Sequence, residues 1–311
     1  MSDSNLTAMP SAVVFAYHSV GVRSIKTLLA RGIDIKLVIS HEDSTTETIW
    51  FESVAALCEE RGIPRITPEN PNTPDVIEQI AAIAPDFIFS FYYRNMLSNE
   101  VLALAKRGAY NLHGSLLPKY RGRVPVNWAV LHGETETGAT LHEMTVKPDA
   151  GAIIGQTAVP ILPDDTAFEV FAKLTVAAEQ TLWKVLPALI AGNAPHLPND
   201  LSKGSYFGGR KPEDGRIDWS QSAQQVYNLH RAVAPPYPGA FTDIKGKRFV
   251  IEKARLINHS ATKVPANLPQ GLSVVDNVVF GVCGDGNAIE ILALKHEGKT
   301  LDSAALSLLL S

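Results

Sequence analysis

The stretch NLHGSLLPKYRGRVPVNWAVLHGETETGATLHEMTVKPDAGAIIGQ, from Asn111 to Gln156, decides the fold that we expect for this chain. It opens with Asn111 and His113, two residues apart, which face the same side if the segment is a strand. It closes with two apolar segments of β type, separated by a loop that contains Asp149. A hairpin at that loop would bring the carboxylate back to the imidazole. We therefore expect these three side chains to gather at one strand end.

These three side-chain types suit the transfer of an acyl group to an amine. The amide of Asn111 can donate N–H groups to a carbonyl oxygen that becomes an oxyanion, and His113 can carry a proton. Asp149 can fix the tautomer of the imidazole and raise its pKa. The same residues also suit a plain structure, because Asn-x-His is commonly a loop pair and Asp beside Gly is a turn former. Spacing alone leaves both interpretations open.

The chain before this stretch alternates between strand and helix patterns. An apolar run from Ala12 to Tyr17 is followed by apolar residues at helical spacing, then Gly32 and a second apolar run from Ile33 to Ser40. This rhythm predicts an α/β fold with a Rossmann-like, mostly parallel sheet. The turn after the first strand reads Tyr-His-Ser-Val-Gly and lacks the G-x-G-x-x-G fingerprint. We therefore expect no nicotinamide or flavin cofactor.

Further elements complete the expected sheet. A helix is expected from about Val54 until near Gly62, and a second one starts at Thr73-Pro74 and buries apolar residues as far as Ile83. A long third helix runs from the capping box Thr166-x-x-Glu169 to Gly192. A buried strand is expected at 87–91. Ligands of open α/β sheets bind outside the carboxyl ends of strands, so the loop after this strand and the end of the Asn111 strand should share one crevice.

The C-terminal third of the sequence changes character. Residues 193–211 show little periodicity and read as a linker. Short strands with turn signals follow at 240–244, 248–256, 272–275, 278–282 and 288–294, and 300–310 reads as a helix. This pattern predicts a small β-barrel. Because it lacks a dense face of basic and aromatic residues, we expect it to bind no nucleic acid.

We expect the domains to follow one another along the sequence. Residues 1–11 form a polar tail, 12–198 the larger domain, 199–214 a linker and 215–311 the smaller C-terminal domain.

Composition limits the function further. The 311 residues include 45% hydrophobic and 19% charged residues, which is typical of a globular protein. A net charge of −4 and a pI near 6.1 give no general attraction for nucleic acid or anionic membranes. Cys58 and Cys283 lie far apart and form no metal-binding pattern, so we expect no metal and a reducing cytoplasm. No signal peptide or membrane span is expected.

The central stretch resembles the formyltransferases that use 10-formyltetrahydrofolate. Their signature Asn-x-His-x-Ser-Leu-Leu-Pro, Arg-Gly, Thr-Gly-x-Thr and Asp-x-Gly is carried here by Asn111, His113, 115–118, 121–122, 137–140 and 149–151. Within the family, VVFAYH from Val13 and FSFYYR from Phe89 are similar to the formyltransferase half of the bifunctional enzymes that act on UDP-4-amino-4-deoxy-L-arabinose. The resemblance spans nearly the whole chain after the first dozen residues and weakens after about Gly192.

The resemblance implies roles for individual residues. It makes 12–198 the formyltransferase catalytic domain and 215–311 an OB-like domain, with Asn111, His113 and Asp149 catalytic. It also implies a set of residues that bind 10-formyltetrahydrofolate: Asn95, Met96, Leu97, Arg123, Thr145, Val146, Lys147, Pro148 and Asp149.

The implied acceptor is the 4-amine of a nucleotide-linked amino sugar, with UDP-4-amino-4-deoxy-L-arabinose first, in lipid A modification and polymyxin resistance. Two alternatives within the same chemistry are a dTDP-4-amino-6-deoxyhexose and the initiator methionyl-tRNA. A third is a folate- or nucleotide-binding module without catalysis. The bifunctional enzymes also carry a decarboxylating dehydrogenase half that has no counterpart here, so we do not expect this chain to perform that oxidation.

Overall fold

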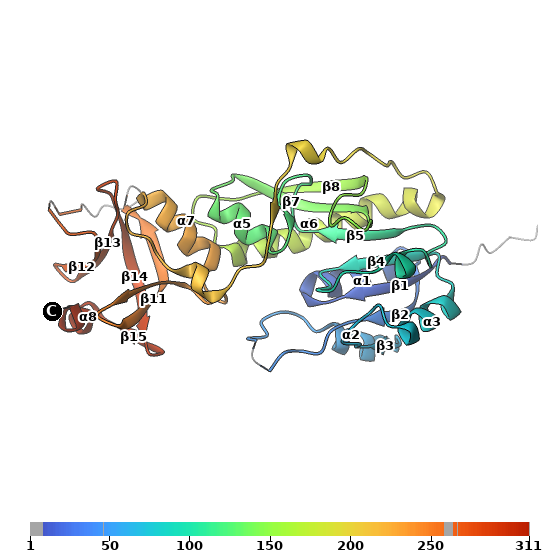
Figure 1. Cartoon of the computed structure of the whole chain (residues 1–311), viewed down its shortest axis with the longest axis horizontal. Helices are drawn as coiled ribbons and strands as arrows, with labels where there is room; N and C mark the ends of the chain where they lie inside the picture. The colour runs from blue at the N-terminus through green and yellow to red at the C-terminus, as the bar shows by residue number, and fades with distance from the viewer. Residues whose placement is uncertain (1–8, 46, 258–263, 266, 311) are drawn as a thin grey trace, which may run out of the picture. The chain divides into compact units, whose positions relative to one another are not determined.

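The computed structural model describes residues 9–45, 47–257, 264–265 and 267–310, which pack as two units (Figure 1). The first unit combines the chain up to Gly122 with Thr137–Val159 and Lys173–Phe207. The second combines Arg123–Glu136, Pro160–Ala172 and the chain from Gly208 onward. Two inner segments of the sequence therefore pack with the C-terminal part. A division of the chain into consecutive domains leaves these segments in the first domain. The linear limits given above stay a prediction.

The first unit is built on a seven-stranded sheet. Its strands, in spatial order, are β3 (Arg65–Ile66), β2 (Asp34–Ile39), β1 (Ser11–Ala16), β4 (Phe87–Phe91), β5 (Ala109–His113), β7 (Glu136–Glu143) and β8 (Ile153–Pro160). The strands from β3 to β5 pair in parallel, and β7 pairs antiparallel with β5. The expected Rossmann-like, mostly parallel sheet is confirmed.

Five helices are associated with this sheet: α1 (His18–Ala30), α2 (Val54–Arg61), α3 (Pro74–Ile83), α4 (Asn99–Leu102) and α6 (Ala167–Ala191). Their ends follow the local signals in the sequence. Helix α2 ends at Gly62, whose φ of 64° is the left-handed conformation that glycine adopts without penalty. Helix α6 begins with the expected capping box, in which the Thr166 N–H donates to Glu169 at 2.7 Å.

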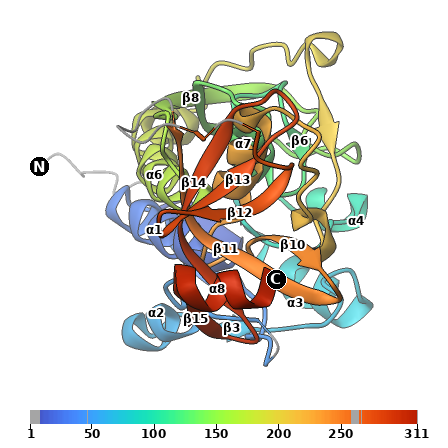
Figure 2. The ribbon, with the colours of Figure 1, turned by 90° about the vertical axis from the view of Figure 1, so that its left-hand side faces the viewer.

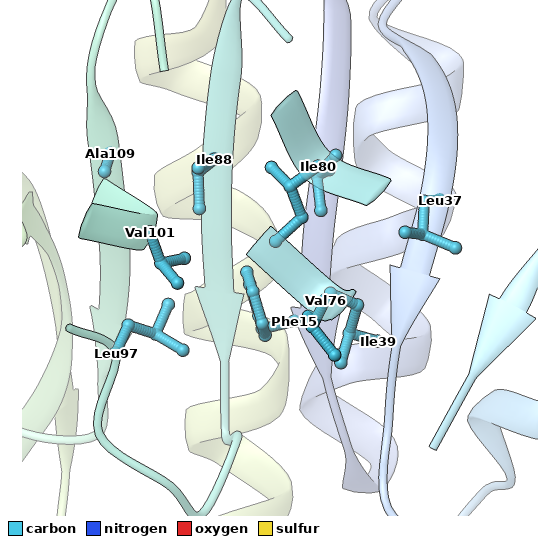
Figure 3. Packing of buried hydrophobic residues seen from close by; sticks show 10 residues of the cluster. Phe15, Leu37, Ile39, Val76, Ile80, Ile88, Leu97, Val101 and Ala109 are labelled. Atoms are coloured by element: carbon cyan, nitrogen blue, oxygen red, sulfur yellow. The ribbon is translucent and has the colours of Figure 1, made fainter. Parts of the chain in front are cut away.

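A buried hydrophobic cluster holds β1, β2 and β4 against α3 and α4 (Figure 3). The side chains of Phe15, Ile39 and Ile88 from the strands and of Ile80 from α3 are fully buried in it. This cluster stabilises the strands whose carboxyl ends carry the polar residues described below.

The second unit is built on a curled antiparallel sheet (Figure 2). Its strands, in spatial order, are β10 (Ala240–Ile244), β11 (Lys247–Leu256), β14 (Ala288–His296), β13 (Val278–Val282) and β12 (Gly271–Val275), and β15 (Lys299–Leu301) also pairs with β14. One edge of β14 pairs with β11, and the other pairs first with β13 and then with β15. The sheet curls into a half-barrel (Figure 2). This confirms the expected smaller β domain.

Helices α5 (Pro125–Leu131), α7 (Ala223–Val233) and α8 (Ser303–Leu310) complete the second unit. The expected C-terminal helix begins at Ser303 instead of residue 300, because residues 299–301 pair with β14 as β15. Within the part of the chain described here, no helix combines the length and the apolar character needed to cross a bilayer.

Two short strands are not predicted by the sequence patterns. Strand β6 (Arg121–Gly122) pairs in parallel with β9 (Tyr206–Phe207), which lies with the 3-10 helix η1 (Leu201–Lys203) in the segment read as a linker. Gly122 has a φ of 96°, and a Cβ at this position would overlap the carbonyl oxygen of Phe207. Only glycine fits there, and this fixes the direction of its N–H group.

We predict that Ile80→Ala lowers the free energy of unfolding by about 2–5 kcal/mol, because it removes buried methyl groups and leaves a cavity. Urea denaturation followed by circular dichroism measures the change. Ile77→Ala, at a partly buried position of the same helix, is the control and should cost clearly less. Equal losses in the two variants would contradict the cluster as described.

Candidate active site

The carboxyl ends of three neighbouring strands carry most of the polar side chains of interest. The strand order reverses between β1 and β4, and open α/β sheets bind ligands at such a switch point. Tyr17 and His18 follow β1, Tyr92 follows β4, and His113 ends β5. The strand ends that the sequence predicts to form a ligand site therefore lie at the switch point, where folds of this type bind ligands.

Asn111 and His113 lie on β5 and face the same side, as their spacing predicts. Asn111 is the register partner of His142 on β7, and its Nδ2 lies 3.0 Å from Nε2 of His142. Nδ1 of His142 lies 2.7 Å from the carbonyl oxygen of Glu143. A carbonyl can only accept, so Nδ1 donates there and Nε2 accepts from Asn111. His142 thus fixes the orientation of the Asn111 amide and leaves its second Nδ2 hydrogen available.

His113 is buried, and both of its ring nitrogens have neighbours. Nε2 donates to the carbonyl oxygen of Tyr120 at 2.7 Å, which fixes the tautomer. Nδ1 lies 3.5 Å from Oδ1 of Asp149. The nitrogen that gains or loses a proton is therefore Nδ1, on the side of the carboxylate.

Asp149 and its loop are held in position by a backbone N–H group and a side-chain amide from other segments. Its φ of 51° is left-handed, a conformation that aspartate tolerates better than most residues. The N–H of Gly122 donates to Oδ2 at 2.7 Å. The Nδ2 group of Asn199 donates to the carbonyl oxygens of Asp149, at 3.0 Å, and Gly151, at 3.1 Å. The structure therefore brings together the three residues that the sequence singled out.

Burial and charge act in opposite directions on this pair. Burial lowers the pKa of His113, and Asp149 raises it by a smaller amount, so the net pKa is below the ordinary value of 6.5. Burial raises the pKa of Asp149, but His113, His142, whose Nε2 lies 3.5 Å from Oδ1, and the Gly122 N–H together hold the pKa of the carboxyl well below its usual range. Asp149 thus acts on the pKa of His113 in the expected direction, but burial outweighs its effect. At neutral pH the site holds a carboxylate beside a neutral imidazole.

A network around Thr140 holds the turn that follows β5. Thr140 donates from Oγ1 to the carbonyl oxygen of Ser115 at 2.6 Å and accepts from the N–H of Leu117 at 3.2 Å. Gln156 on β8 donates to Thr140 and to the carbonyl oxygen of Leu117, both at 2.9 Å. The Ser-Leu-Leu-Pro turn is therefore anchored to the two strands beside it.

The first group of expected folate-binding residues lies in the loop after β4. Asn95 donates from Nδ2 to the carbonyl oxygen of Glu69 at 3.0 Å, and Met96 is 56% exposed. The side chain of Leu97 is 8% exposed and belongs to the cluster of Figure 3. Leu97 can therefore offer a ligand its backbone, while its side chain supports the core.

The second group lies between β7 and β8. Thr145 donates from Oγ1 to the carbonyl oxygen of Lys147 at 2.9 Å, and Val146 is 64% exposed. Pro148 precedes Asp149 in the same loop. Arg123 is exposed and belongs to the second unit. Among the residues that the structure describes, no group of His, Cys, Asp or Glu could hold a metal ion.

An aromatic wall lines the switch point. His18 stacks on Phe51 with ring centroids 3.8 Å apart, and Trp50 meets the same imidazole edge to face. His41 stacks on Tyr93 at 4.2 Å. Burial, assisted by the charge of Arg94, lowers the pKa of His18 to about 3 and that of His41 to about 4. The wall is neutral at physiological pH.

The sequence analysis missed His142, the carbonyl of Tyr120, the N–H of Gly122 and Asn199. Of these, only His142 left a usable signal. It lies two residues after Thr140 in a strand pattern, which places both residues on one face of β7.

Two protein-family models match this chain. A model described as "Formyl transferase" matches residues 12–186, and one described as "Formyl transferase, C-terminal domain" matches residues 210–306. The chain belongs to the formyl transferase family. The resemblance in the central stretch is thereby confirmed at the level of the family.

Solved structures share the fold of this formyl transferase. WlaRD, a sugar 3N-formyl transferase crystallised with dTDP and 5-N-formyl-THF, has a TM-score of 0.71 at 20% identity, covering 94% of this chain and 99% of that chain. The Helicobacter canadensis N-formyltransferase, in complex with folinic acid and dTDP-3-aminofucose, has a TM-score of 0.68 at 20% identity, covering 91% and 98%. HypX from Aquifex aeolicus, in complex with tetrahydrofolic acid, has a TM-score of 0.63 at 18% identity, covering 96% of this chain and 47% of its own. These similarities establish the common fold of both domains.

We predict that His113 titrates below pH 6.5 in the folded enzyme, and that Asp149→Asn lowers its pKa further, because the variant removes the group that raises it. NMR titration of the His113 ring protons measures both midpoints, with exposed His196 as the internal reference. A higher midpoint in Asp149→Asn would contradict the arrangement.

Proposed function

We propose that this enzyme transfers the formyl group of 10-formyltetrahydrofolate to the 4-amine of a nucleotide-linked amino sugar, with UDP-4-amino-4-deoxy-L-arabinose as the first candidate. The observation that carries the proposal is the convergence of Asn111, His113 and Asp149 at one strand end, with the imidazole neutral. Formyl transfer to an amine needs an oxyanion donor and a base that starts without a proton.

The proposed reaction begins when the amine nitrogen attacks the formyl carbon. A C–N bond forms, and the carbonyl electrons move to the oxygen. This oxyanion accepts a hydrogen bond from the second Nδ2 hydrogen of Asn111. Nδ1 of His113 takes a proton from the attacking nitrogen, and the carboxylate of Asp149, 3.5 Å away, stabilises the imidazolium. Collapse of the intermediate then breaks the bond to N10 of the folate. His113 gives its proton to that nitrogen and returns to the neutral state.

Several observations support the formyl donor. The sugar N-formyltransferases of similar fold are crystallised with reduced folates. The exposed positions Met96 and Val146 lie in the two loops to which the family resemblance assigns the folate. The residues in the assigned set are Asn95, Met96, Leu97, Arg123, Thr145, Val146, Lys147, Pro148 and Asp149.

The choice of acceptor rests on weaker support than the choice of reaction. The segments Val13–His18 and Phe89–Arg94 resemble the enzymes for UDP-4-amino-4-deoxy-L-arabinose. The solved neighbours are instead complexes with dTDP or dTDP-3-aminofucose, which keeps a dTDP-linked sugar as the second candidate. The net charge of −4 counts against methionyl-tRNA. A binding module without catalysis would have no use for a histidine placed to accept a proton.

The cellular role follows from the acceptor. With the UDP-linked arabinose amine the enzyme would act in the cytoplasm on a precursor for lipid A modification and contribute to polymyxin resistance. With a dTDP-linked sugar it would supply surface polysaccharide synthesis.

We predict that His113→Ala lowers kcat by about 10²- to 10⁴-fold, the usual contribution of a positioned acid–base group. Steady-state formylation kinetics with saturating substrates measure the effect. His196→Ala, which removes an exposed histidine of the same unit, is the control and should retain activity. Near wild-type turnover in His113→Ala would remove His113 from the mechanism.

We predict formylation of UDP-4-amino-4-deoxy-L-arabinose when the purified enzyme is given 10-formyltetrahydrofolate and each acceptor separately. The other acceptors are a dTDP-4-amino-6-deoxyhexose and charged initiator tRNA, and mass spectrometry of the products reports each reaction. Preference for the dTDP sugar would keep the mechanism and change the pathway. Formylation of tRNA alone would overturn the sugar assignment, and no product with any amine would favour a binding module.

A further inference from the structure

A segment that the sequence patterns read as part of a linker runs along the candidate active site. Residues 197–207, which we call the strap, follow helix α6 and belong to the first unit. The strap begins beside β8, where Leu197 and Ile153 exchange two backbone hydrogen bonds, both at 2.9 Å. It ends at β9, which pairs with β6. Between these ends it contacts the two segments that carry the neighbours of the His113 ring nitrogens.

The first contact of the strap is with the loop that carries Asp149. The side-chain amide of Asn199 donates to the carbonyl oxygens of Asp149, at 3.0 Å, and Gly151, at 3.1 Å. One side chain therefore spans the turn in which Asp149 has its left-handed φ of 51°. The same turn is tightly packed, since a Cβ on Gly151 would overlap the carbonyl oxygen of Glu143. The backbone of Asp149 is thus fixed while its carboxylate lies 3.5 Å from His113.

The second contact of the strap is with the turn that carries Tyr120. The N–H of Tyr120 donates to the hydroxyl of Ser205 at 2.9 Å. The N–H of Arg121 donates to the carbonyl oxygen of Ser205 at 3.0 Å, and the N–H of Ser205 donates to the carbonyl oxygen of Pro118 at 3.3 Å. Hydrogen bonds to one serine therefore fix the direction of the Tyr120 carbonyl, which accepts from Nε2 of His113 at 2.7 Å.

The residues on both sides of Ser205 pack closely against the same turn. A Cβ on Gly204 would lie 2.2 Å from the carbonyl oxygen of Pro118, so a larger residue does not fit there. The ring of Phe207 stacks on that of Tyr120 with centroids 5.5 Å apart. The hydroxyl of Ser205 is therefore held at the Tyr120 N–H by its neighbours in the strap.

We propose that Asn199 and Ser205 are positioning residues for the formyl transfer. Asn199 places the carboxylate of Asp149 beside Nδ1 of His113. Ser205 places the carbonyl of Tyr120 where it accepts from Nε2 of the same ring. That hydrogen bond keeps a proton on Nε2 and so leaves Nδ1 to accept the proton of the amine. The inference rests on the proposed function for the reaction that these two residues serve, and both act through other groups.

Nitrogen-15 NMR of the histidine rings in the purified protein tests the role of Ser205, because the ring shifts report which nitrogen carries the proton. Ser205→Ala removes the acceptor of the Tyr120 N–H and is expected to give a mixture of the two neutral tautomers of His113. It should also lower kcat about 3- to 10-fold, the effect of one hydrogen bond, without a change in KM. Ser205→Thr keeps a hydroxyl and should restore the single tautomer and the turnover.

Titration of the His113 ring protons tests the role of Asn199. Asn199→Ala removes both hydrogen bonds to the Asp149 loop. The pKa of His113 is expected to fall, because the carboxylate that raises it is no longer held beside the ring. The decrease should be smaller than in Asp149→Asn, which removes the charge itself.

Ser202→Ala is the matched control, because Ser202 is exposed in the same strap and its hydroxyl donates to the nearby Asp200 at 2.6 Å. It should leave the tautomer, the pKa and kcat unchanged. A wild-type tautomer in Ser205→Ala overturns the role of Ser205, and a wild-type pKa in Asn199→Ala overturns that of Asn199, even if the melting temperature falls.

Equal changes in Ser202→Ala would also overturn the proposal, since they would indicate a general loosening of the strap. If Ser205→Ala does not fold, Asn199→Ala carries the test alone, and an unchanged pKa of His113 overturns the proposal. The NMR measurements do not depend on turnover, so a failed acceptor assay leaves these results readable.

Discussion

The carboxylate of Asp149 is the point on which the candidate active site depends, because three separate parts of the chain meet on it. The loop between β7 and β8 supplies the residue in a left-handed conformation, which costs about 1–2 kcal/mol for most L-residues. The β6–β9 pair supplies the N–H of Gly122, and β5 supplies His113. Asp149 lies 27 residues after Gly122 in the sequence, and farther still from His113. The ionised form of this carboxyl is therefore stabilised only when the first unit is assembled. The short β6–β9 pair contributes because it positions the N–H of Gly122.

In the proposed mechanism, the balance of burial and charge at His113 gives a role to both the carboxylate and the dry environment. With the carboxylate alone, the imidazole would tend to be protonated before the reaction and could not accept a proton from an amine. With burial alone, the imidazolium that forms during the reaction would have no compensating charge. The observed arrangement keeps the ring neutral at rest and still offers Oδ1 of Asp149 at 3.5 Å when the ring becomes charged. Because Nε2 already carries the proton that it donates to the Tyr120 carbonyl, an added proton goes to Nδ1, which faces Asp149.

Local sequence patterns predict the features that depend on neighbouring residues, such as helix ends and the face of a strand. They do not predict the features that depend on strand register or on burial. Gly62 and Gly192 end helices as expected, and the two-residue spacing of Asn111 and His113 places them on one face. His142 was missed because its position opposite Asn111 is set by the β5–β7 register, and a shift of one residue would turn it to the other face. The two-residue strands β6 and β9 are too short to show a period. The net direction of the His113 pKa shift depends on burial, and the core position of the Leu97 side chain depends on packing. Neither can be predicted from the local sequence.

The neutral character of the switch point limits the kinds of ligand group that it can recognise. His18 and His41 are uncharged at physiological pH, and the cation among them, Arg94, is already paired with both carboxylate oxygens of Glu47, at 2.8 and 2.9 Å. Such a wall suits stacking against a flat, uncharged ring and offers little to a diphosphate.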